Sequence, residues 1–237
     1  MNIAIIGYGK MGEQVEIAAL ERKHRIVAYI DCEADWKKQA KEFETADVAI
    51  DFSMPSVVVA NIRHCFDAHK PVVVGTTGWM EHLPSIRKQC EEEGQTLFYA
   101  SNFSMGVNLF FRLNRYLAKM MAPYEAYDVN IEEIHHTSKK DAPSGTAIVL
   151  ANDIIAQHPK KDSWVGEMNG NQSELSISSQ RMGDQVGTHS VIYTSPMDEI
   201  VITHRSFNRK AFAIGAVCAA EWVLGKKGVF TMEEMMG

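Results

Sequence analysis

The chain has 237 residues, of which 46% are hydrophobic and 23% charged, a composition typical of folded globular proteins. Its net charge of −6 argues against nucleic acid as a partner, and no segment approaches the roughly 20 apolar residues of a membrane helix. The four cysteines are at least 25 residues apart, which fits neither a zinc knuckle nor a dense disulfide framework. Because the chain opens directly into an apolar segment without a basic leader, we expect a cytoplasmic protein without membrane contact.

Short β-branched segments alternate with amphipathic ones over the first hundred residues. The strand candidates are continuously apolar, which is typical of a parallel sheet covered on both faces. We expect strands at 3–6, 26–30, 48–52, 72–74 and 96–99, with helices that include 11–22 and 83–93.

The pattern changes after residue 102. Helices are expected over 107–121 and 145–157, and a strand over 128–134. Three later segments, near 174–179, 187–195 and 198–206, alternate apolar and polar residues, which indicates a more open and partly antiparallel sheet. A final helix over 211–225 could return to cover the first sheet. We therefore predict one domain from residues 1–104 and 210–237, and a mixed domain, 105–209, inserted between these parts.

The first chemical signal is Gly7-Tyr8-Gly9-Lys10-Met11-Gly12, which matches G-x-G-x-x-G between a predicted strand and a predicted helix. Glycines at this position let backbone amides approach a pyrophosphate at the helix start. Asp31 follows Gly12 by 19 residues, close to the spacing of an acid that binds ribose hydroxyls. The pattern predicts a Rossmann-type dinucleotide-binding domain; the alternative is a tight turn without a ligand.

The residues near Asp31 bear on the choice between NADH and NADPH. An acid here repels a 2′-phosphate and favours NADH, and the next residue is Cys32, not arginine. Lys37 and Lys38 could compensate if their segment folded back; otherwise they are solvated surface residues. Both cofactors stay open at this point.

Two further loops follow predicted strands, Gly75-Thr76-Thr77-Gly78 and Ala100-Ser101-Asn102-Phe103. In an open parallel sheet, ligands bind beyond the carboxyl ends of the strands, so both loops are expected at the same edge as the glycine turn. Their amides and hydroxyls could hold the nicotinamide end. The alternative is that they form ordinary turns.

The second chemical signal is the polar segment from Glu132 to Ala147, which leaves a strand and enters a helix. An imidazole of His135 or His136 can deliver a proton near neutral pH, and a lysine such as Lys139 can hold a carboxylate. Ser144 is a natural N-cap, and the amides of Gly145 and Thr146 form an anion site at the helix start. Together they predict a site for a small acidic substrate beside a proton donor.

Other interpretations of this segment remain. Ser144 could cap the helix without touching a ligand, and Glu132, Glu133 and Asp141 are more often solvated or ion-paired than catalytic. The histidine pair could bind a metal, but adjacent residues on a strand point to opposite faces, and no third ligand lies at a recognisable spacing. We therefore expect no metal.

From Glu133 to Ala147 the chain matches E-x-H-H-x-x-K-x-D-A-P-S-G-T-A at every fixed position. This segment closely resembles the signature of the dihydrodipicolinate reductases (4-hydroxy-tetrahydrodipicolinate reductases) of diaminopimelate and lysine biosynthesis. The glycine turn, the 75–78 loop and the 102–104 segment are similar to the same family. The resemblance implies NAD(P)H-dependent reduction of 4-hydroxy-tetrahydrodipicolinate (dihydrodipicolinate) to tetrahydrodipicolinate, in a homotetramer formed through the sheets of the inserted domains.

The resemblance also implies individual roles. His135 would be the proton donor and Lys139 its acidic or electrostatic partner. His136, Lys139, Ser144, Gly145 and Thr146 would bind the small dicarboxylate. The residues implied to hold NADH or NADPH are Gly7, Tyr8, Gly9, Lys10, Met11, Gly12, Asp31, Gly75, Thr76, Thr77, Ala100, Ser101, Asn102, Phe103 and Arg209.

The chain departs from the family pattern at three places. Ser101 replaces a usual proline, no arginine follows Asp31, and 166–179 lacks a regular glycine-rich phrase, which leaves the shape of that loop open. Two rival functions stand beside the family reading. One is a two-domain reductase of another small acid or semialdehyde, and the other is a dinucleotide-sensing regulatory protein without turnover.

Overall fold

The computed structural model describes residues 1–166 and 171–237. The chain divides into two units, one formed by 1–105 with 210–237 and the other by 106–209. Across the described ranges, no helix has the length and apolar character needed to cross a membrane.

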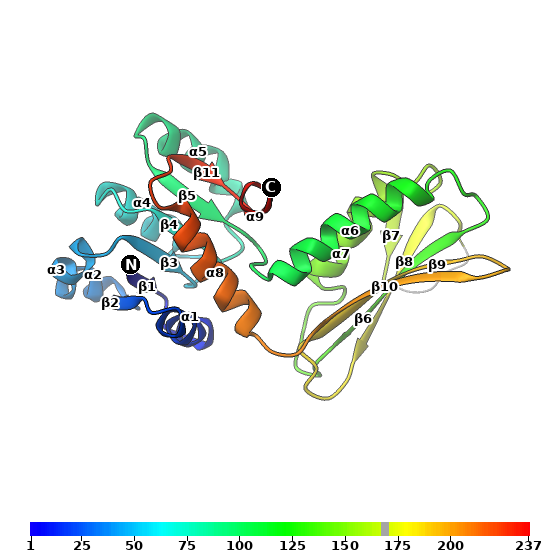
Figure 1. Ribbon diagram of the computed structural model, residues 1–237, viewed down its shortest axis with the longest axis horizontal. Helices are drawn as coiled ribbons and strands as arrows, with labels where there is room; N and C mark the ends of the chain where they lie inside the picture. The colour runs from blue at the N-terminus through cyan, green and yellow to red at the C-terminus, as the bar shows by residue number, and fades with distance from the viewer. Residues whose placement is uncertain (167–170) are drawn as a thin grey trace. The chain divides into compact units, whose positions relative to one another are not determined.

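The first unit is built on a six-stranded sheet in the order β11-β5-β4-β3-β1-β2, and every neighbouring pair is parallel (Figure 1). Its strands are β1 (Asn2–Ile6), β2 (Arg25–Ile30), β3 (Val48–Asp51), β4 (Val72–Val74), β5 (Thr96–Tyr99) and β11 (Gly228–Phe230). Its helices are α1 (Lys10–Glu21), α2 (Glu33–Lys38), α3 (Ala40–Glu44), α4 (Val58–Asp67), the 3-10 turn η1 (Met80–His82), α5 (Leu83–Glu92), α8 (Lys210–Val223) and α9 (Met232–Met236).

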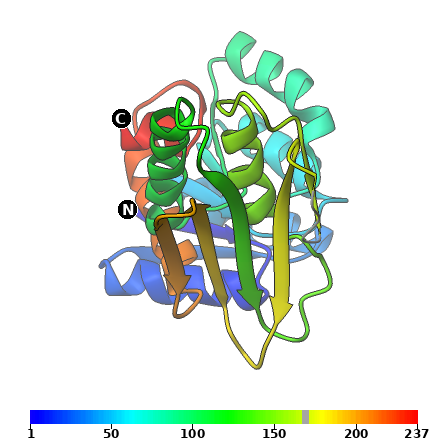
Figure 2. The same cartoon turned by 90° about the vertical axis from the view of Figure 1, so that its right-hand side faces the viewer.

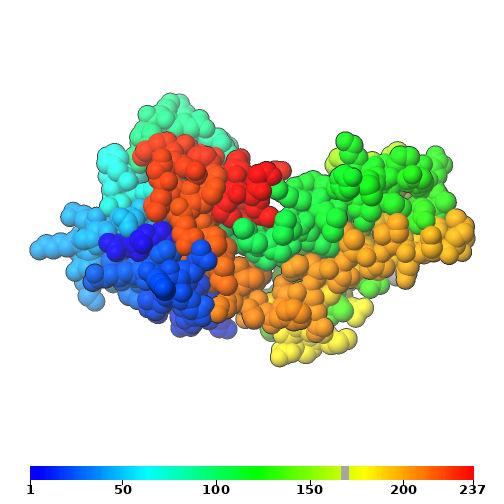
Figure 3. All heavy atoms as spheres, in the orientation of Figure 1, coloured from blue at the N-terminus to red at the C-terminus, as the bar shows by residue number. Residues whose placement is uncertain are grey.

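Apolar cores lie on both faces of this sheet, which explains the continuously apolar strands. Side chains such as Ile3 and Ile5 pack with α1 and α8 on one face, while Ala4 and Ile6 pack with α4 and α5 on the other. The C-terminal segment, orange and red in Figure 3, covers part of the blue N-terminal segment, so both ends of the chain build this unit. The predicted α/β fold of Rossmann type is confirmed.

The strand order places a topological switch point between β1 and β3. The chain runs from β1 to β2 on one side and then crosses to β3 on the other. Ligands of open parallel sheets bind outside the carboxyl ends of the strands at this point. The loops that begin at Gly7, Asp31 and Phe52 all leave the sheet at that edge.

The second unit contains a mixed five-stranded sheet in the order β10-β9-β6-β8-β7. Its elements are α6 (Met105–Met121), β6 (Asp128–His135), α7 (Gly145–Ile155), β7 (Ser163–Val165), β8 (Glu174–Arg181), β9 (Gly187–Thr194) and β10 (Glu199–Ser206). Strands β6, β8 and β7 run parallel, whereas β9 is antiparallel to both β6 and β10. The sequence analysis left the shape of segment 166–179 open. In this segment, residues 171–173 precede β8, and residues 167–170 lie outside the described residues.

Helices α6 and α7 cover one face of the second sheet, and the core there contains Ile131, Leu150, Leu175 and Val191. Figure 2 looks onto the other, uncovered face. Side chains alternate between buried and more exposed positions along β6, and also along β9, where the sequence predicted alternation. The register of β6 decides which of its polar side chains are buried.

Candidate active site

The glycine turn joins β1 to α1. Two of its glycines, Gly7 and Gly12, are closely packed, whereas the space around Gly9 is empty. Gly7 has φ +84°, and a Cβ there would lie 2.5 Å from the Phe52 carbonyl oxygen. A Cβ at Gly12 would lie 2.4 Å from the Gly7 carbonyl oxygen, whereas one at Gly9 would meet nothing within 4 Å. Gly9 also precedes α1 without a side-chain cap. The first amides of α1 are therefore accessible to a phosphate.

Asp31 directly follows β2 and lies beside this turn, at the strand end where the sequence predicted it. Its Oδ1 accepts a hydrogen bond of 2.8 Å from the Tyr8 backbone N–H. Next to it lies a cavity of about 240 Å³. Its lining comes from the segments after β1, β2 and β3 and includes Gly7, Asp31, Trp36, Ser53, Met54 and Val57. A concave site with apolar walls beside a carboxylate and open amides fits the adenosine half of a dinucleotide.

The charge around this cavity is acidic. Cys32 and Glu33 contribute to the lining together with Asp31. Lys37 and Lys38, which could have compensated for Asp31, lie on α2 and are not part of the lining. Nothing basic in the described lining therefore offsets the repulsion of a 2′-phosphate.

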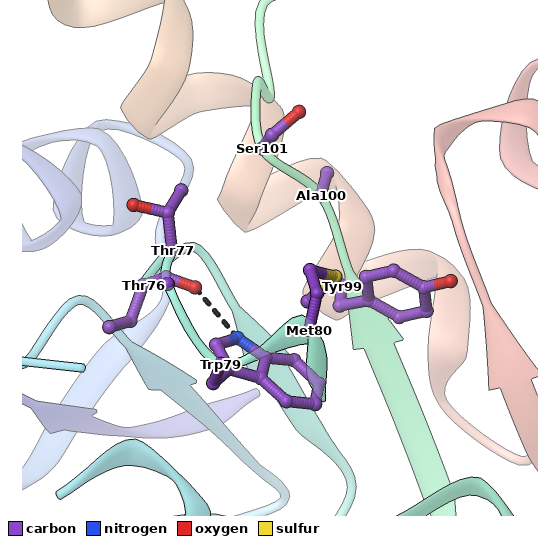
Figure 4. Close-up of a pocket in the computed structure, with 8 residues that line it drawn as sticks. Thr76, Thr77, Trp79, Met80, Tyr99, Ala100 and Ser101 are labelled. Atoms are coloured by element: carbon purple, nitrogen blue, oxygen red, sulfur yellow. Dashed lines mark hydrogen bonds between the residues drawn. The ribbon is translucent and has the colours of Figure 1, made fainter. Parts of the chain in front are cut away.

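A second cavity, of about 230 Å³, lies at the carboxyl ends of β4 and β5 (Figure 4). It is lined by Thr76, Thr77, Gly78, Trp79, Met80, Tyr99, Ala100 and Ser101. Trp79 is buried and its Nε1 donates a hydrogen bond of 2.8 Å to the Thr76 carbonyl, which fixes the indole below the loop. Gly75 stands where a Cβ would overlap the Phe52 ring. The apolar walls fit a flat ring such as nicotinamide.

Asp51 is the residue of this region that the sequence analysis missed. It is fully buried at the end of β3, and its carboxylate accepts hydrogen bonds from the Thr76 and Ser53 hydroxyls, at 2.6 and 2.8 Å, and from Asn61 Nδ2 at 2.9 Å. Burial raises the pKa of Asp51, although these hydrogen bonds oppose the rise. The Thr76 hydroxyl therefore turns inward and anchors the loop. The sequence signal that could have identified Asp51 is an acidic residue at the end of an apolar strand.

The other predicted cofactor residues lie in different settings. Phe103 is buried in the first unit, and its ring packs against those of Phe52 and Phe98, with centroids 5.9 and 5.7 Å away. Asn102 accepts a hydrogen bond from the Ser104 N–H at 2.9 Å. Arg209 is exposed and is the last residue of the second unit.

In the second unit, β6 and the loop after it carry the predicted proton donor. His135 is buried at the end of β6, whereas His136 lies just beyond it and its Nδ1 is 2.8 Å from the Ser138 hydroxyl. Burial lowers the pKa of His135 to about 4, and the charge of Lys139 contributes to this. The Lys139 ammonium bonds both carboxylate oxygens of Asp141, at 2.7 and 2.8 Å.

The loop then enters α7 as predicted. The Ser144 hydroxyl caps the helix by accepting the Ala147 N–H at 3.3 Å. Gly145 is exposed, and a Cβ there would meet nothing within 4 Å. The helix start is therefore open to an anion, and the capping and ligand-binding interpretations of Ser144 are compatible.

The structure brings His135 together with two possible ligands that the sequence spacing did not indicate. Glu133, His135 and His189 are all buried, and one potential ligand atom from each lies within 4.8 Å of the others. Sequence spacing could not indicate this, because His189 comes from β9, where it pairs with Glu133 across the sheet. Glu133 already accepts hydrogen bonds from the Ser144 N–H, the Ser179 hydroxyl and Arg181. These donors account for the carboxylate without an ion.

The parallel sheet and glycine turn of the first unit, with a buried histidine and glutamate cluster in the second, are those of a nicotinamide-dependent oxidoreductase. The family description "dihydrodipicolinate reductase, N-terminus" matches residues 1–103, and "dihydrodipicolinate reductase, C-terminus" matches 106–236. The chain therefore belongs to the dihydrodipicolinate reductase family, as its sequence resemblance indicated.

Individual relatives agree with this assignment. The chain is 46% identical over 236 residues to a 4-hydroxy-tetrahydrodipicolinate reductase of Christiangramia forsetii, covering 100% of this chain and 98% of the relative. A dipicolinate-bound dihydrodipicolinate reductase from Paenisporosarcina sp. TG-14 has the same fold, with a TM-score of 0.77 at 24% identity over 100% and 99% of the two chains. A probable dehydrogenase from Thermotoga maritima is more distant, with a TM-score of 0.55 at 11% identity over 99% and 92%.

Proposed function

We propose that this enzyme reduces 4-hydroxy-tetrahydrodipicolinate (dihydrodipicolinate) to tetrahydrodipicolinate in diaminopimelate and lysine biosynthesis. The observation that carries the proposal is the segment from Glu133 to Ala147, which combines a buried imidazole, an ammonium group and an open helix start within one unit. Family membership supports the same substrate. The first unit is proposed as the dinucleotide-binding domain, and the second as the substrate and tetramerisation domain.

The chain's own residues have two tasks toward the substrate. The two carboxylates of the substrate are bound by His136, Lys139 and the helix start at Ser144-Gly145-Thr146. Lys139 gives up its contact with Asp141 and binds a substrate carboxylate in its place. His135 delivers a proton to the ring carbon next to the one that accepts hydride. Such positioning of the reacting groups and of the proton donor supplies much of the rate enhancement in reactions of this type.

The cofactor supplies the hydride. Gly7 to Gly12 hold the pyrophosphate, Asp31 the adenosine ribose, and the loops at 75–77 and 100–103 the nicotinamide end, with Arg209 as an additional contact. We propose NADH as the preferred cofactor, because the adenosine cavity has acidic groups and no lysine in its described lining. Initial rates with NADH and NADPH test the preference, which Asp31→Ser would weaken; a higher kcat/KM for NADPH in the unchanged enzyme would contradict it.

Two features concern the protein as a whole. We propose a homotetramer formed through the uncovered face of the second sheet, where Ile134, Ile192 and Val201 share one side with serines and threonines. Sedimentation analysis tests this proposed oligomeric state.

We propose the cytoplasm as the location of the protein, in keeping with free thiols on the four cysteines, all of which lie in the described ranges.

The activity test uses the purified enzyme with enzymatically generated cyclic dicarboxylate. Oxidation of the reduced cofactor is expected only when the dicarboxylate is present, and His135→Gln should lower kcat by about 10²–10⁴-fold with little change in cofactor affinity. Oxidation triggered instead by a semialdehyde would favour the rival reductase. Tight cofactor binding without oxidation by any substrate would favour the sensing protein.

A further inference from the structure

Glu133 is a buried carboxylate in the middle of the substrate-binding unit. It lies on the covered face of β6, opposite His189 of β9 and Ser179 of β8, and is fully buried. The Ser179 hydroxyl donates to Oε1 at 2.8 Å, and Arg181 Nη2 lies 3.2 Å from the same oxygen. The Ser144 N–H donates to both carboxylate oxygens, at 3.1 and 3.2 Å.

The other carboxylate oxygen, Oε2, faces two imidazoles. It lies 3.5 Å from His135 Nδ1 and 3.5 Å from His189 Nε2, and the two rings meet edge to face with centroids 4.9 Å apart. Within the described chain, His135 Nδ1 has no closer hydrogen-bonding partner. The contact between His135 and Glu133 is therefore a charge contact at 3.5 Å, and the carboxylate attracts a proton on Nδ1 without a hydrogen bond in this conformation.

Glu133 is ionised in this environment. Burial alone would raise the pKa of Glu133, but hydrogen bonds from His189, Ser144 and Ser179 lower it well below its usual range. An ionised carboxylate favours the imidazole tautomer that carries its proton on Nδ1, and it stabilises the doubly protonated ring. The other ring nitrogen of His135, Nε2, packs close to Gly187. A Cβ on residue 187 would lie 3.0 Å from this nitrogen.

The same carboxylate also anchors the start of α7. It accepts the Ser144 N–H, and the Ser144 hydroxyl both caps the helix and lies 3.1 Å from His189 Nε2. Arg181 adds a second tether, because its Nη2 also donates to the Asp141 carbonyl at 2.5 Å. One carboxylate thus fixes the strand that carries the donor and the loop that leads to the helix start.

We propose that Glu133 is a positioning residue for the reduction, which orients His135 and stabilises its protonated form while holding it in register with the start of α7. The proposal deepens the proposed function and rests on it. Two other roles for Glu133 compete with this one. The carboxylate could only stabilise the fold, or it could be a metal ligand. Arg181 beside the carboxylate opposes a second cation, which disfavours the metal.

The charged groups around His135 come from several elements and set the sign of the pH effect. Glu133 on its own strand raises the pKa of His135, whereas burial and the charges of His189 on β9, Arg181 on β8 and Lys139 in the following loop lower it. Removal of the Glu133 charge therefore disfavours the protonated donor. Turnover, which requires that form, should then be lost at lower pH.

The test compares Glu133→Gln with Glu125→Gln, which makes the same change at an exposed carboxylate in the loop before β6, outside the uncovered face of the sheet. In Glu133→Gln, we expect kcat to fall at least about tenfold and the alkaline loss of kcat to move down by about 1–3 pH units. The KM for NADH and cooperative thermal unfolding should be retained. Glu125→Gln should keep the kcat and pH profile of the unchanged enzyme.

A kcat within about threefold of the unchanged enzyme, with an unmoved pH profile, would overturn the proposal. So would a stoichiometric metal ion in the purified enzyme that Glu133→Gln loses. If Glu133→Gln does not fold, Glu133→Asp keeps the charge but withdraws the carboxylate by one methylene; it should lower kcat, and full kcat would overturn the proposal. Absence of turnover in the unchanged enzyme would instead refute the proposed function, so the two failures are distinguishable.

Discussion

Binding of a dicarboxylate is expected to place a proton on His135. Burial lowers the pKa of this imidazole to about 4, and the charges of His189, Lys139 and Arg181 act in the same direction, against Glu133. Since the folded-state pKa lies far below 7, the side chain is neutral in the ligand-free enzyme at neutral pH. A neutral imidazole is a weak proton donor, so the substrate must bring about its protonation.

The size of the effect can be worked from these charges. Protonating a group of pKa about 4 at pH 7 costs about 4 kcal/mol. One carboxylate about 6 Å away contributes about 2.8 kcal/mol at an effective dielectric constant of about 20, and two contribute about 5.5 kcal/mol. Two carboxylates therefore exceed the cost, although Lys139 and the helix start neutralise part of their charge. Uptake of about half to one proton per site is expected at pH 7.

Titration calorimetry with dipicolinate at pH 7, in buffers of different ionisation enthalpy, measures this uptake directly. The slope of the observed enthalpy against buffer enthalpy gives the number of protons bound. Picolinate, which has one carboxylate, is the matched ligand control and should take up far less, and His135→Gln should bind dipicolinate without this uptake. A slope of zero in the unchanged enzyme, or an equal slope in His135→Gln, would refute the reasoning.

The first unit offers three further predictions. Asp51→Asn should raise the KM for NADH several-fold and leave that for the dicarboxylate unchanged in steady-state kinetics, because Thr76 loses its anchoring carboxylate. Alkylation of the exposed Cys32, followed by peptide mass spectrometry, should slow when NADH fills the adjacent cavity, and an unchanged rate would contradict that placement. Gly215→Ala should lower stability by about 1–3 kcal/mol in chemical denaturation, since a Cβ would lie 1.8 Å from the Phe103 carbonyl oxygen; unchanged stability would contradict this close contact.

Much of the fold could be predicted from the sequence, because buried parallel strands are continuously apolar. The strands at β4 and β5 have the predicted bounds, and α6 begins only two residues before the predicted helix. Strands β7 and β11 were not predicted. Each has three residues, as β4 does, but only β4 consists wholly of β-branched residues. The mixed sequences of β7 and β11 carry no such signal, and the place of each strand in its sheet depends on tertiary pairing.

The site was predictable to the extent that its residues are adjacent in sequence. The glycine turn and the capped start of α7 follow from local chemistry and were found. The contacts of Glu133 with His189 and Arg181 depend on strand register between segments some 50 residues apart, which spacing does not encode. Glu133 had one usable signal, since it continues the buried alternation of Val129 and Ile131.

The charge around His135 also bears on which acid the enzyme reduces. Two carboxylates near the imidazole offset more of the cost of charging it than one does, because each contributes a similar Coulomb energy. A semialdehyde with a single carboxylate should therefore bring about less protonation of His135 than the cyclic dicarboxylate does. We expect this difference to add to the preference for a doubly charged substrate, beyond the contribution of binding.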